Sequence, residues 1–203
     1  MLAAESQVDA WKLRTGQIKT DEEFSLIRDT LDKLSKAPIY VDDESSNNII
    51  RMRAVARRLK SEGGLGLIIV DYLQLMVTNK NYDSLVHQVT DISRSLKGLA
   101  RDLDIPVLAL SQLNRAVEQR GGEPRLSDLR DSGSIEQDAD VVLFIHREDR
   151  YDKNSTKPNI AKIIIAKHRN GPTGEIELYF DEKRVSFNNI DKADYGSNSF
   201  GDF

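Results

Sequence analysis

The strongest constraint on the fold is a run of mostly apolar residues, Leu65 to Val70, that ends at a single acidic residue, Asp71. A strand without polar alternation is typical of a parallel sheet in an α/β domain, where both faces are covered. Ligands of such sheets lie beyond the carboxyl ends of the strands. Asp71 is therefore predicted to hold a cation, a water molecule or a phosphate-bound metal, unless it only caps the following turn.

Two further apolar runs, at 105–112 and 139–146, predict two more buried strands. Strand, helix and strand in this order predict a right-handed parallel crossover between the first two. Residues 161–180 are predicted to form two strands joined by a Gly/Pro turn. The intervening helix is expected to be long and amphipathic, because apolar residues recur at steps of three and four: Leu85, Val89, Ile92, Leu96, Leu99 and Leu103.

The first sixty residues are predicted to be mainly helical. A short strand is expected at 38–41 and a helix at 48–60. With 203 residues and no interdomain linker, we expect one domain over 1–190 and a flexible tail over 191–203. Thr20 and Glu23 have the spacing of a capping box, and the apolar residues after it predict one stripe facing the core: Phe24, Ile27, Leu31 and Leu34.

Composition argues against several classes of protein. The chain has no cysteine, and its three histidines, His87, His146 and His168, lie too far apart for a zinc site. A formal net charge of -4 excludes a surface that is basic throughout but leaves local nucleic-acid contacts open. The chain has neither the roughly 20 consecutive apolar residues that span a bilayer nor the features of a secretion signal at its N-terminus. A cytoplasmic protein without membrane contact is expected.

Residues 112–138 form a long connection between the second and third predicted strands. Such connections are usually functional or disordered. This one contains Gly121, Gly122 and Gly133 together with cap signals for local helical turns. The sequence therefore predicts a mobile functional loop, and the alternative is a surface excursion without a role.

Polar residues follow all three predicted strands: Asp71, Gln112 and Arg147. They converge on one edge if the sheet is parallel. A carboxylate beside an amide suits a nucleotide site, because the carboxylate holds the Mg²⁺ shell while the amide donates to a phosphate oxygen and accepts from a water. The alternative for Gln112 is a cap on the loop. Lys167 and Arg169 lie two apart on one side of a strand, which favours an anionic partner or, alternatively, a solvated edge pair.

Four blocks of sequence together resemble the C-terminal motor domain of the bacterial DnaB-type replicative DNA helicases. The blocks are "GLGLIIVDYLQLM", "ISRSLKGLARDLDIPVLALSQLNRAVEQR", "LSDLRDSGSIEQDADVVLFIHRED" and "IIIAKHRNGPTGEIELYF". The similarity extends from "KLRTG" at 12–16 to about residue 190. It implies an α/β, RecA-like three-layer fold with a mostly parallel sheet, here without the N-terminal strands of the motor domain.

The resemblance also implies a nucleotide site for ATP and Mg²⁺. Asp71 resembles the Walker B aspartate and Gln112 the sensor of the γ-phosphate. Lys167 with Arg169 resembles the basic finger pair that acts on the ATP of a neighbouring subunit. Arg147 is expected to contribute to nucleotide binding.

A second implied site binds DNA. Arg130, Asp131 and Gly133 resemble the central-channel loop that tracks single-stranded DNA. Contacts there would be made largely to phosphates through backbone N–H groups and one arginine, so an acidic chain can bind DNA without sequence preference.

The chain departs from the family pattern in one large respect. No G-x-x-x-x-G-K-[ST] motif occurs in the 203 residues. The upstream strand with the catalytic glutamate and the primase-contacting domain of the family are absent too. We expect a truncated or clipped motor domain, or a degenerate relative, and we expect the isolated chain to be inactive.

Two functions from different classes fit these observations. The first is an ATP-dependent DNA helicase, active at full length as a homo-hexamer on single-stranded DNA, with primase and a helicase loader as the partners that the family implies. The second is a non-catalytic RecA-like interaction module that binds helicases or recombinases. The retained sensor, finger pair and Asp71 favour the first. A RecA-type recombinase fits less well, because the "RNGPTG" and "RDSGSIEQDAD" segments match the helicases better.

Overall fold

The computed structural model describes residues 1–44, 48–78, 82, 84–114, 117, 120–152 and 155–190, without the side chains of 130–132. The chain divides into two compact units. The first comprises Met1–Val41, Ile145–Ile164 and Glu175–Phe203, and the second comprises Asp42–Phe144 and Ile165–Gly174. The predicted tail, 191–203, lies outside the described residues.

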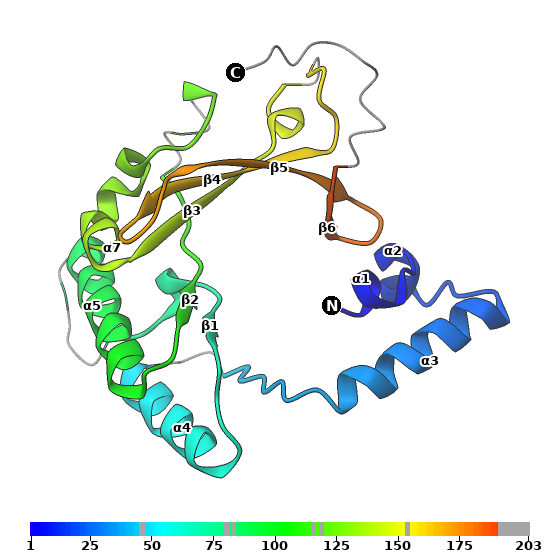
Figure 1. The fold of residues 1–203 in the computed structure, drawn as a ribbon, viewed down its shortest axis with the longest axis horizontal. Coiled ribbons are helices and arrows are strands. Elements are labelled where there is room, and N and C mark those ends of the chain that lie inside the picture. The colour runs from blue at the N-terminus through cyan, green and yellow to red at the C-terminus, as the bar shows by residue number, and fades with distance from the viewer. Residues whose placement is uncertain are drawn as a thin grey trace. The chain divides into compact units, whose positions relative to one another are not determined.

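The core of the second unit is a strand, helix and strand in sequence order (Figure 1). Strands β1 (Ile68–Val70) and β2 (Val107–Ala109) pair in parallel, as the sequence predicts. In this register, Ile68 lies opposite Val107 and Val70 opposite Ala109. Helix α5 (Leu85–Leu103) connects them and packs against α4 (Ile49–Glu62). The hydrophobic core lies among these elements and contains Ala56, Val70, Leu73, Met76, Ile92, Leu96, Leu99, Leu103 and Ile105.

Helix α5 follows the predicted periodicity closely. The Ser84 hydroxyl accepts a hydrogen bond from the Val86 amide, and Asp104 ends the helix with a left-handed φ of 48°. Burying a large aliphatic side chain contributes about 1.5 to 3 kcal/mol. The predicted stripe is buried except for Leu85, which is 59% exposed: the buried members are Val89, Ile92, Leu96, Leu99 and Leu103.

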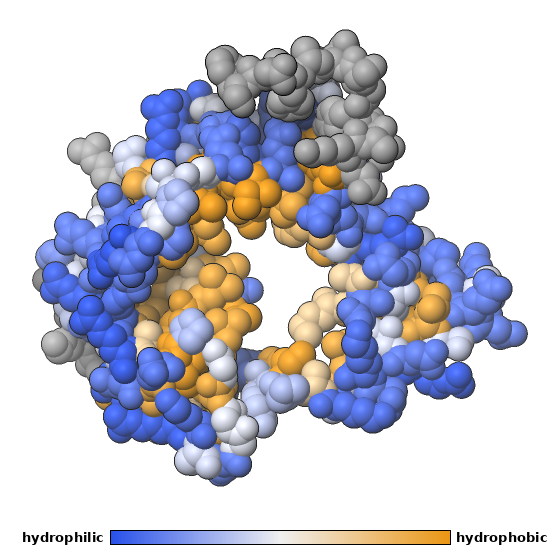
Figure 2. Space-filling model, in the orientation of Figure 1, coloured by the Kyte–Doolittle hydropathy of each residue, from blue (hydrophilic) through white to orange (hydrophobic). Residues whose placement is uncertain are grey.

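The predicted burial of the strands on both faces is wrong for this structure. In β3 (Val141–His146), Val142 and Phe144 are buried while their neighbours are exposed. The described chain covers only one face of β3, so its continuous apolar sequence shows alternating burial. Hydrophobic residues are consequently left on the surface (Figure 2), among them Leu67, Ile69, Leu108, Leu110, Val141 and Leu143.

The remaining strands form a four-stranded sheet in the order β3-β4-β5-β6. The two strands predicted within 161–180 are confirmed as β4 (Ile160–His168) and β5 (Gly174–Asp181). Strand β5 pairs antiparallel with β6 (Ser186–Asn189). In the turn between β4 and β5, a Cβ at Gly171 would lie 2.3 Å from Cε1 of His168, so a larger residue there would displace the His168 ring.

Two predictions for the N-terminal residues are wrong. Helices α1 (Leu2–Ser6), α2 (Ala10–Thr15) and α3 (Asp21–Ser35) form, and Thr20 caps α3 as predicted. The expected core-facing stripe is not buried, because α3 packs chiefly against the short α1, which leaves Phe24 56% and Leu31 51% exposed. Residues 38–41 form no strand, since they have no ladder partner in the described part of the chain.

Candidate functional site

Asp71 and Gln112 lie just beyond the carboxyl ends of the paired strands β1 and β2. Leu110 donates its amide to the Val70 carbonyl at 2.9 Å, and its own carbonyl accepts from the Leu73 amide at 2.9 Å. The structure thus brings the two strand ends together, as the sequence predicts. Both side chains are exposed, and neither forms a hydrogen bond or ion pair with the part of the chain that the structure describes. A carboxylate and an amide are therefore available to a ligand.

Gln74, which sequence reasoning missed, holds the main chain at the end of β2. It lies in η1 (Leu73–Leu75), directly after Asp71 and Tyr72. Its Oε1 accepts from the Gln112 amide at 3.3 Å, and its Nε2 donates to the Ser111 hydroxyl at 3.1 Å. The Gln112 backbone is thus held, while its side chain has no partner among the described residues. The sequence does contain a signal for this role, because Gln74 is a single polar residue within the apolar stretch "YLQLM".

The connection after Gln112 is folded around a buried carboxylate, Asp128. Both terminal nitrogens of Arg120 donate to Asp128 at 2.9 Å, and the Arg125 amide donates to it at 2.7 Å. These bonds, that of Arg120 first, hold the pKa of Asp128 below its usual value. The Asn114 amide donates to the Asp128 carbonyl at 3.3 Å, which ties the start of the connection to its middle. These hydrogen bonds fold the connection, which argues against the alternative of a surface loop without a role.

The predicted helical turns of this connection are confirmed. They are η2 (Leu126–Ser132) and α7 (Gly133–Asp138). Gly133 begins α7, and the backbone of Arg130 and Asp131 belongs to η2. The side chains of Arg130 and Asp131 lie outside the described residues, so their DNA contact stays a prediction.

Lys167 and Arg169 both contact the end of α7. The Lys167 ammonium donates to the Glu136 carbonyl at 2.5 Å, and Arg169 donates from Nη2 to the Gln137 carbonyl at 3.3 Å. Arg169 also pairs with Asp140 at 3.2 Å. The two predicted finger residues therefore share one site on the segment that follows the predicted DNA-contact residues.

Arg147 has a different environment, in the other unit. Its guanidinium pairs with Asp149 at 2.6 Å and Glu182 at 3.0 Å, and lies 4.6 Å from the centre of the Phe180 ring. The hydrogen bond to Asp149, and then that to Glu182, raises the pKa of Arg147. Only 10% of its side chain is exposed, which favours a structural role. Its nucleotide contact, and its convergence with Asp71, stay predictions.

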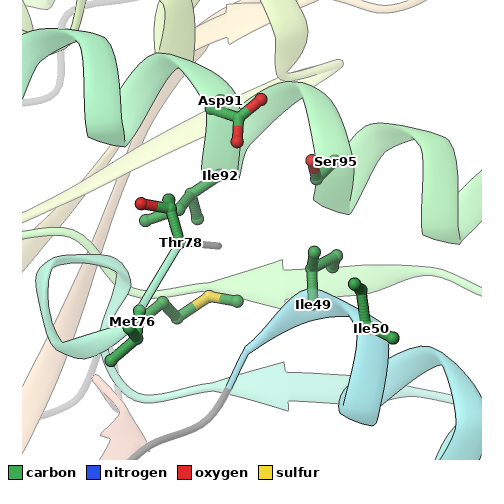
Figure 3. Close-up of a pocket in the computed structure, with 8 residues that line it drawn as sticks. Ile49, Ile50, Met76, Thr78, Asp91, Ile92 and Ser95 are labelled. Atoms are coloured by element: carbon green, nitrogen blue, oxygen red, sulfur yellow. The ribbon is translucent and has the colours of Figure 1, made fainter. Parts of the chain in front are cut away.

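A pocket beside α5 contains none of the predicted site residues (Figure 3). It has a volume of about 150 Å³, smaller than the roughly 300 Å³ at which ligand sites usually begin. Its lining residues come from α4, from the segment after η1 and from α5: Ile49, Ile50, Met76, Val77, Thr78, Asp91, Ile92 and Ser95. The pocket is too small and too apolar to be the nucleotide site.

The surroundings of Asp71 fit the Mg²⁺ ion that the family resemblance implies. Mg²⁺ is usually held by one or two carboxylates together with waters and substrate phosphates, so it does not need a cage of protein ligands. The exposed Asp71 carboxylate supplies one such oxygen ligand. Within the described residues, no cluster of three or more His, Cys, Asp and Glu side chains could hold a metal on its own.

None of the helices in the described part of the chain is both long and apolar enough to cross a membrane.

Comparison with known proteins gives consistent matches. The sequence model of the DnaB-like helicase C terminal domain matches residues 1–189. The chain is 48% identical over 194 residues to the replicative DNA helicase DnaB of Geobacillus stearothermophilus. The aligned residues cover 95% of this chain and 42% of that protein. It is 47% identical over 194 residues to the replicative DNA helicase DnaC of Bacillus subtilis, with the same coverage. The chain thus spans less than half the length of these curated relatives.

A solved structure agrees with the sequence matches. A DnaB-like replicative helicase, determined with its interactions with primase, superposes with a TM-score of 0.89 at 38% identity. The match covers 94% of this chain and 46% of that chain. The predicted α/β, RecA-like fold is therefore confirmed. This chain belongs to the family of DnaB-like helicase C-terminal domains.

Proposed function

We propose that this chain supplies the γ-phosphate sensor, the finger pair and the DNA-contacting loop of an ATP-dependent replicative DNA helicase, which acts as a homo-hexameric ring on single-stranded DNA. The placement of Asp71 and Gln112 carries the proposal. They follow neighbouring parallel strands, their side chains are exposed, and Gln112 leads directly into the folded connection around Asp128. A nucleotide site and a loop are thereby joined by one residue.

In this mechanism each residue has a separate task. Asp71 holds the Mg²⁺ shell, and the ion when bound neutralises charge on the phosphates. Gln112 contacts the terminal phosphate and orients a water through its amide. Gln74 holds the Gln112 main chain at the end of β2, and the connection that leads to the DNA loop begins directly after Gln112. Hydrolysis and the position of the DNA loop are linked in this way.

The exposed apolar faces of β1, β2 and β3 support a larger motor domain. Their sequences are apolar on both faces, yet the described chain covers one. Within the described residues, strand β2 ends the two-stranded sheet and β3 ends the four-stranded sheet, so each has an edge without a partner there. Open apolar edges of this kind are normally paired or covered in native proteins. We propose that strands of the remaining motor domain, including the phosphate loop, pair with these edges.

The proposed partners follow from the relatives. The similar DnaB-like replicative helicase was determined with its interactions with primase. Primase and a helicase loader are therefore proposed as partners of the full-length protein, and single-stranded DNA as its track. The cytoplasmic location expected from the sequence belongs to the same proposal.

The first test addresses the sensor. In the full-length protein, Gln112→Ala is expected to leave ATP affinity within about twofold of wild type and to abolish the stimulation of ATP hydrolysis by single-stranded DNA. The physical reason is that the amide joining phosphate and loop is lost while Asp71 is unchanged. Steady-state ATP hydrolysis with and without DNA measures the effect.

Gln74→Ala is the matched comparison for that variant. It removes the hydrogen bonds that hold the Gln112 main chain but leaves the sensing amide in place. We expect partial stimulation by DNA. Normal DNA-stimulated turnover in Gln112→Ala would remove Gln112 from the sensor role.

The second test addresses the DNA loop. Arg130→Ala in the full-length protein is expected to weaken single-strand binding similarly for all sequences. The slope of log affinity against log salt should fall by roughly 0.7 for one lost phosphate contact. Arg28→Ala is the control, because it removes the same positive charge from a position on α3 where the side chain is 80% exposed. A slope unchanged from wild type, or a loss confined to certain sequences, would assign Arg130 a structural role.

The alternative function, a non-catalytic interaction module, is supported by the missing phosphate-loop motif and by the same exposed apolar faces. A module of that kind has no need of a free Asp71, a free Gln112 and a basic finger pair together. We therefore place it second.

A further inference from the structure

The finger pair is not free in this structure, and what holds it suggests a further residue of the machinery. Lys167 and Arg169 make their contacts within one short segment, 136–140, which we call the holding segment. Its carbonyls at Glu136 and Gln137 accept from the two side chains. Its last residue, Asp140, contacts Arg169 twice.

The two contacts of Asp140 with Arg169 differ in kind. The Asp140 carbonyl accepts from the Arg169 amide at 2.8 Å, which fixes the backbone that carries the finger. The Asp140 carboxylate lies 3.2 Å from Nη1 of Arg169, which fixes the direction of the side chain. Backbone and guanidinium are thus oriented by the same residue.

The holding segment is itself anchored on α5. The Ser93 hydroxyl donates to the Asp138 carboxylate at 2.8 Å. The Lys97 ammonium pairs with the second oxygen of the Asp140 carboxylate. Because Ser93 and Lys97 lie one turn apart on a helix that also packs into the core, the segment has a rigid support.

The ion pair between Arg169 and Asp140 is exposed enough for Arg169 to leave Asp140 and bind another anionic group. Arg169 is 44% and Asp140 53% exposed, and ion pairs exposed to this degree are weak and easily broken. Arg147, by contrast, is 10% exposed and held by two carboxylates. An arginine in a weak, directed pair can transfer its planar fork to a phosphate, which accepts it bidentately.

We propose that Asp140 is the positioning residue of the finger, and that the holding segment passes the state of the DNA loop to it. This inference rests on the proposed function, since it requires Arg169 to act on a neighbouring ATP. Gly133, the last of the predicted DNA-contact residues, begins α7, and the holding segment completes α7 and ends at Asp140. A displacement of the loop by DNA therefore moves the acceptors that hold Lys167 and Arg169.

The test separates the two partners of the Asp140 carboxylate in full-length rings. Asp140→Ala is expected to lower kcat for DNA-stimulated ATP hydrolysis at least about tenfold, because a catalytic group misplaced by about 1 Å can cost about 10²-fold. KM for ATP and the affinity for single-stranded DNA should change less than about twofold. Lys97→Ala, which removes only the α5 partner, should lower kcat clearly less than Asp140→Ala. Asp140→Asn, which keeps an acceptor for Arg169, should recover most of the lost rate.

The outcomes distinguish the positioning role of Asp140 from the finger role of Arg169 on which it rests. If Arg169→Ala leaves turnover intact, the proposed finger fails and this inference fails with it. If Arg169→Ala abolishes turnover while Asp140→Ala does not change kcat, only the positioning role is overturned. Equal losses in Asp140→Ala and Lys97→Ala would show that Asp140 merely joins β3 to α5. Ring assembly is checked by size-exclusion chromatography, and Asp140→Asn serves if the alanine variant does not assemble.

Discussion

Arg169→Ala in the full-length protein is expected to lower ATP turnover by about 10³ to 10⁵, the effect of an arginine finger supplied in trans in well-studied nucleotidases. The guanidinium stabilises charge that develops on the transferred phosphoryl group, so its loss affects the chemical step more than ATP binding. We expect kcat to fall while the affinity for ATP changes little. Arg169→Lys is the matched variant, because lysine keeps the charge but lacks the planar fork.

The same variant tests whether the finger acts on a neighbour. A subunit with Arg169→Ala has an intact Asp71, and a subunit with a substituted Asp71 has an intact finger. Mixed rings contain some interfaces at which both halves are sound, so their ATP turnover should exceed the sum of the two variants measured alone. The comparison requires subunit exchange, which fluorescence energy transfer between labelled subunits can confirm.

Failure of the rescue has two readings that a further titration separates. If exchange is complete and the mixture stays at the sum, either the finger acts within its own subunit or the ring needs every site. Titrating each variant with wild-type subunits distinguishes these cases. A steep loss of activity at low fractions of variant shows that all sites are needed, and a linear loss shows a finger in cis.

The sequence predicted the elements whose pattern depends on local periodicity and on buried neighbours close in the chain. Helix α5 and the parallel pairing of β1 with β2 are of this kind. The strand ends could be placed because polar residues interrupt apolar runs there. The family membership followed from long ordered blocks rather than from any single residue.

Other features depend on partners that periodicity does not reveal. The α3 stripe is apolar at helical spacing, yet burial needs an opposing surface that the short α1 does not provide. A strand at 38–41 needs a ladder partner. Arg147 has the position of a ligand residue, but only the structure shows that Asp149 and Glu182 pair with it. Gln74 acts through a hydrogen bond from its side chain to the backbone amide of Gln112, a residue 38 positions away.

The absence of a phosphate-loop motif leads to the second large prediction. Asp71, Gln112 and the finger pair each contribute to an ATP site, but nothing in the 203 residues has the glycine-rich loop that cradles the α- and β-phosphates. The 203-residue chain by itself should therefore neither bind ATP tightly nor hydrolyse it. Its finger can still be competent, since it acts on another subunit's nucleotide.

The measurement that tests the account most directly is ATP hydrolysis by the 203-residue chain and by the full-length protein that contains it, side by side, with and without single-stranded DNA. A full-length protein carrying Asp71→Ala serves as the background control. We expect the chain to match this background, and the full-length protein to hydrolyse ATP with strong stimulation by DNA. ATP hydrolysis by the pure chain would contradict the account, because the chemistry would then reside in residues assigned other roles. A full-length protein without DNA-stimulated hydrolysis would contradict it as well, and would favour the interaction module.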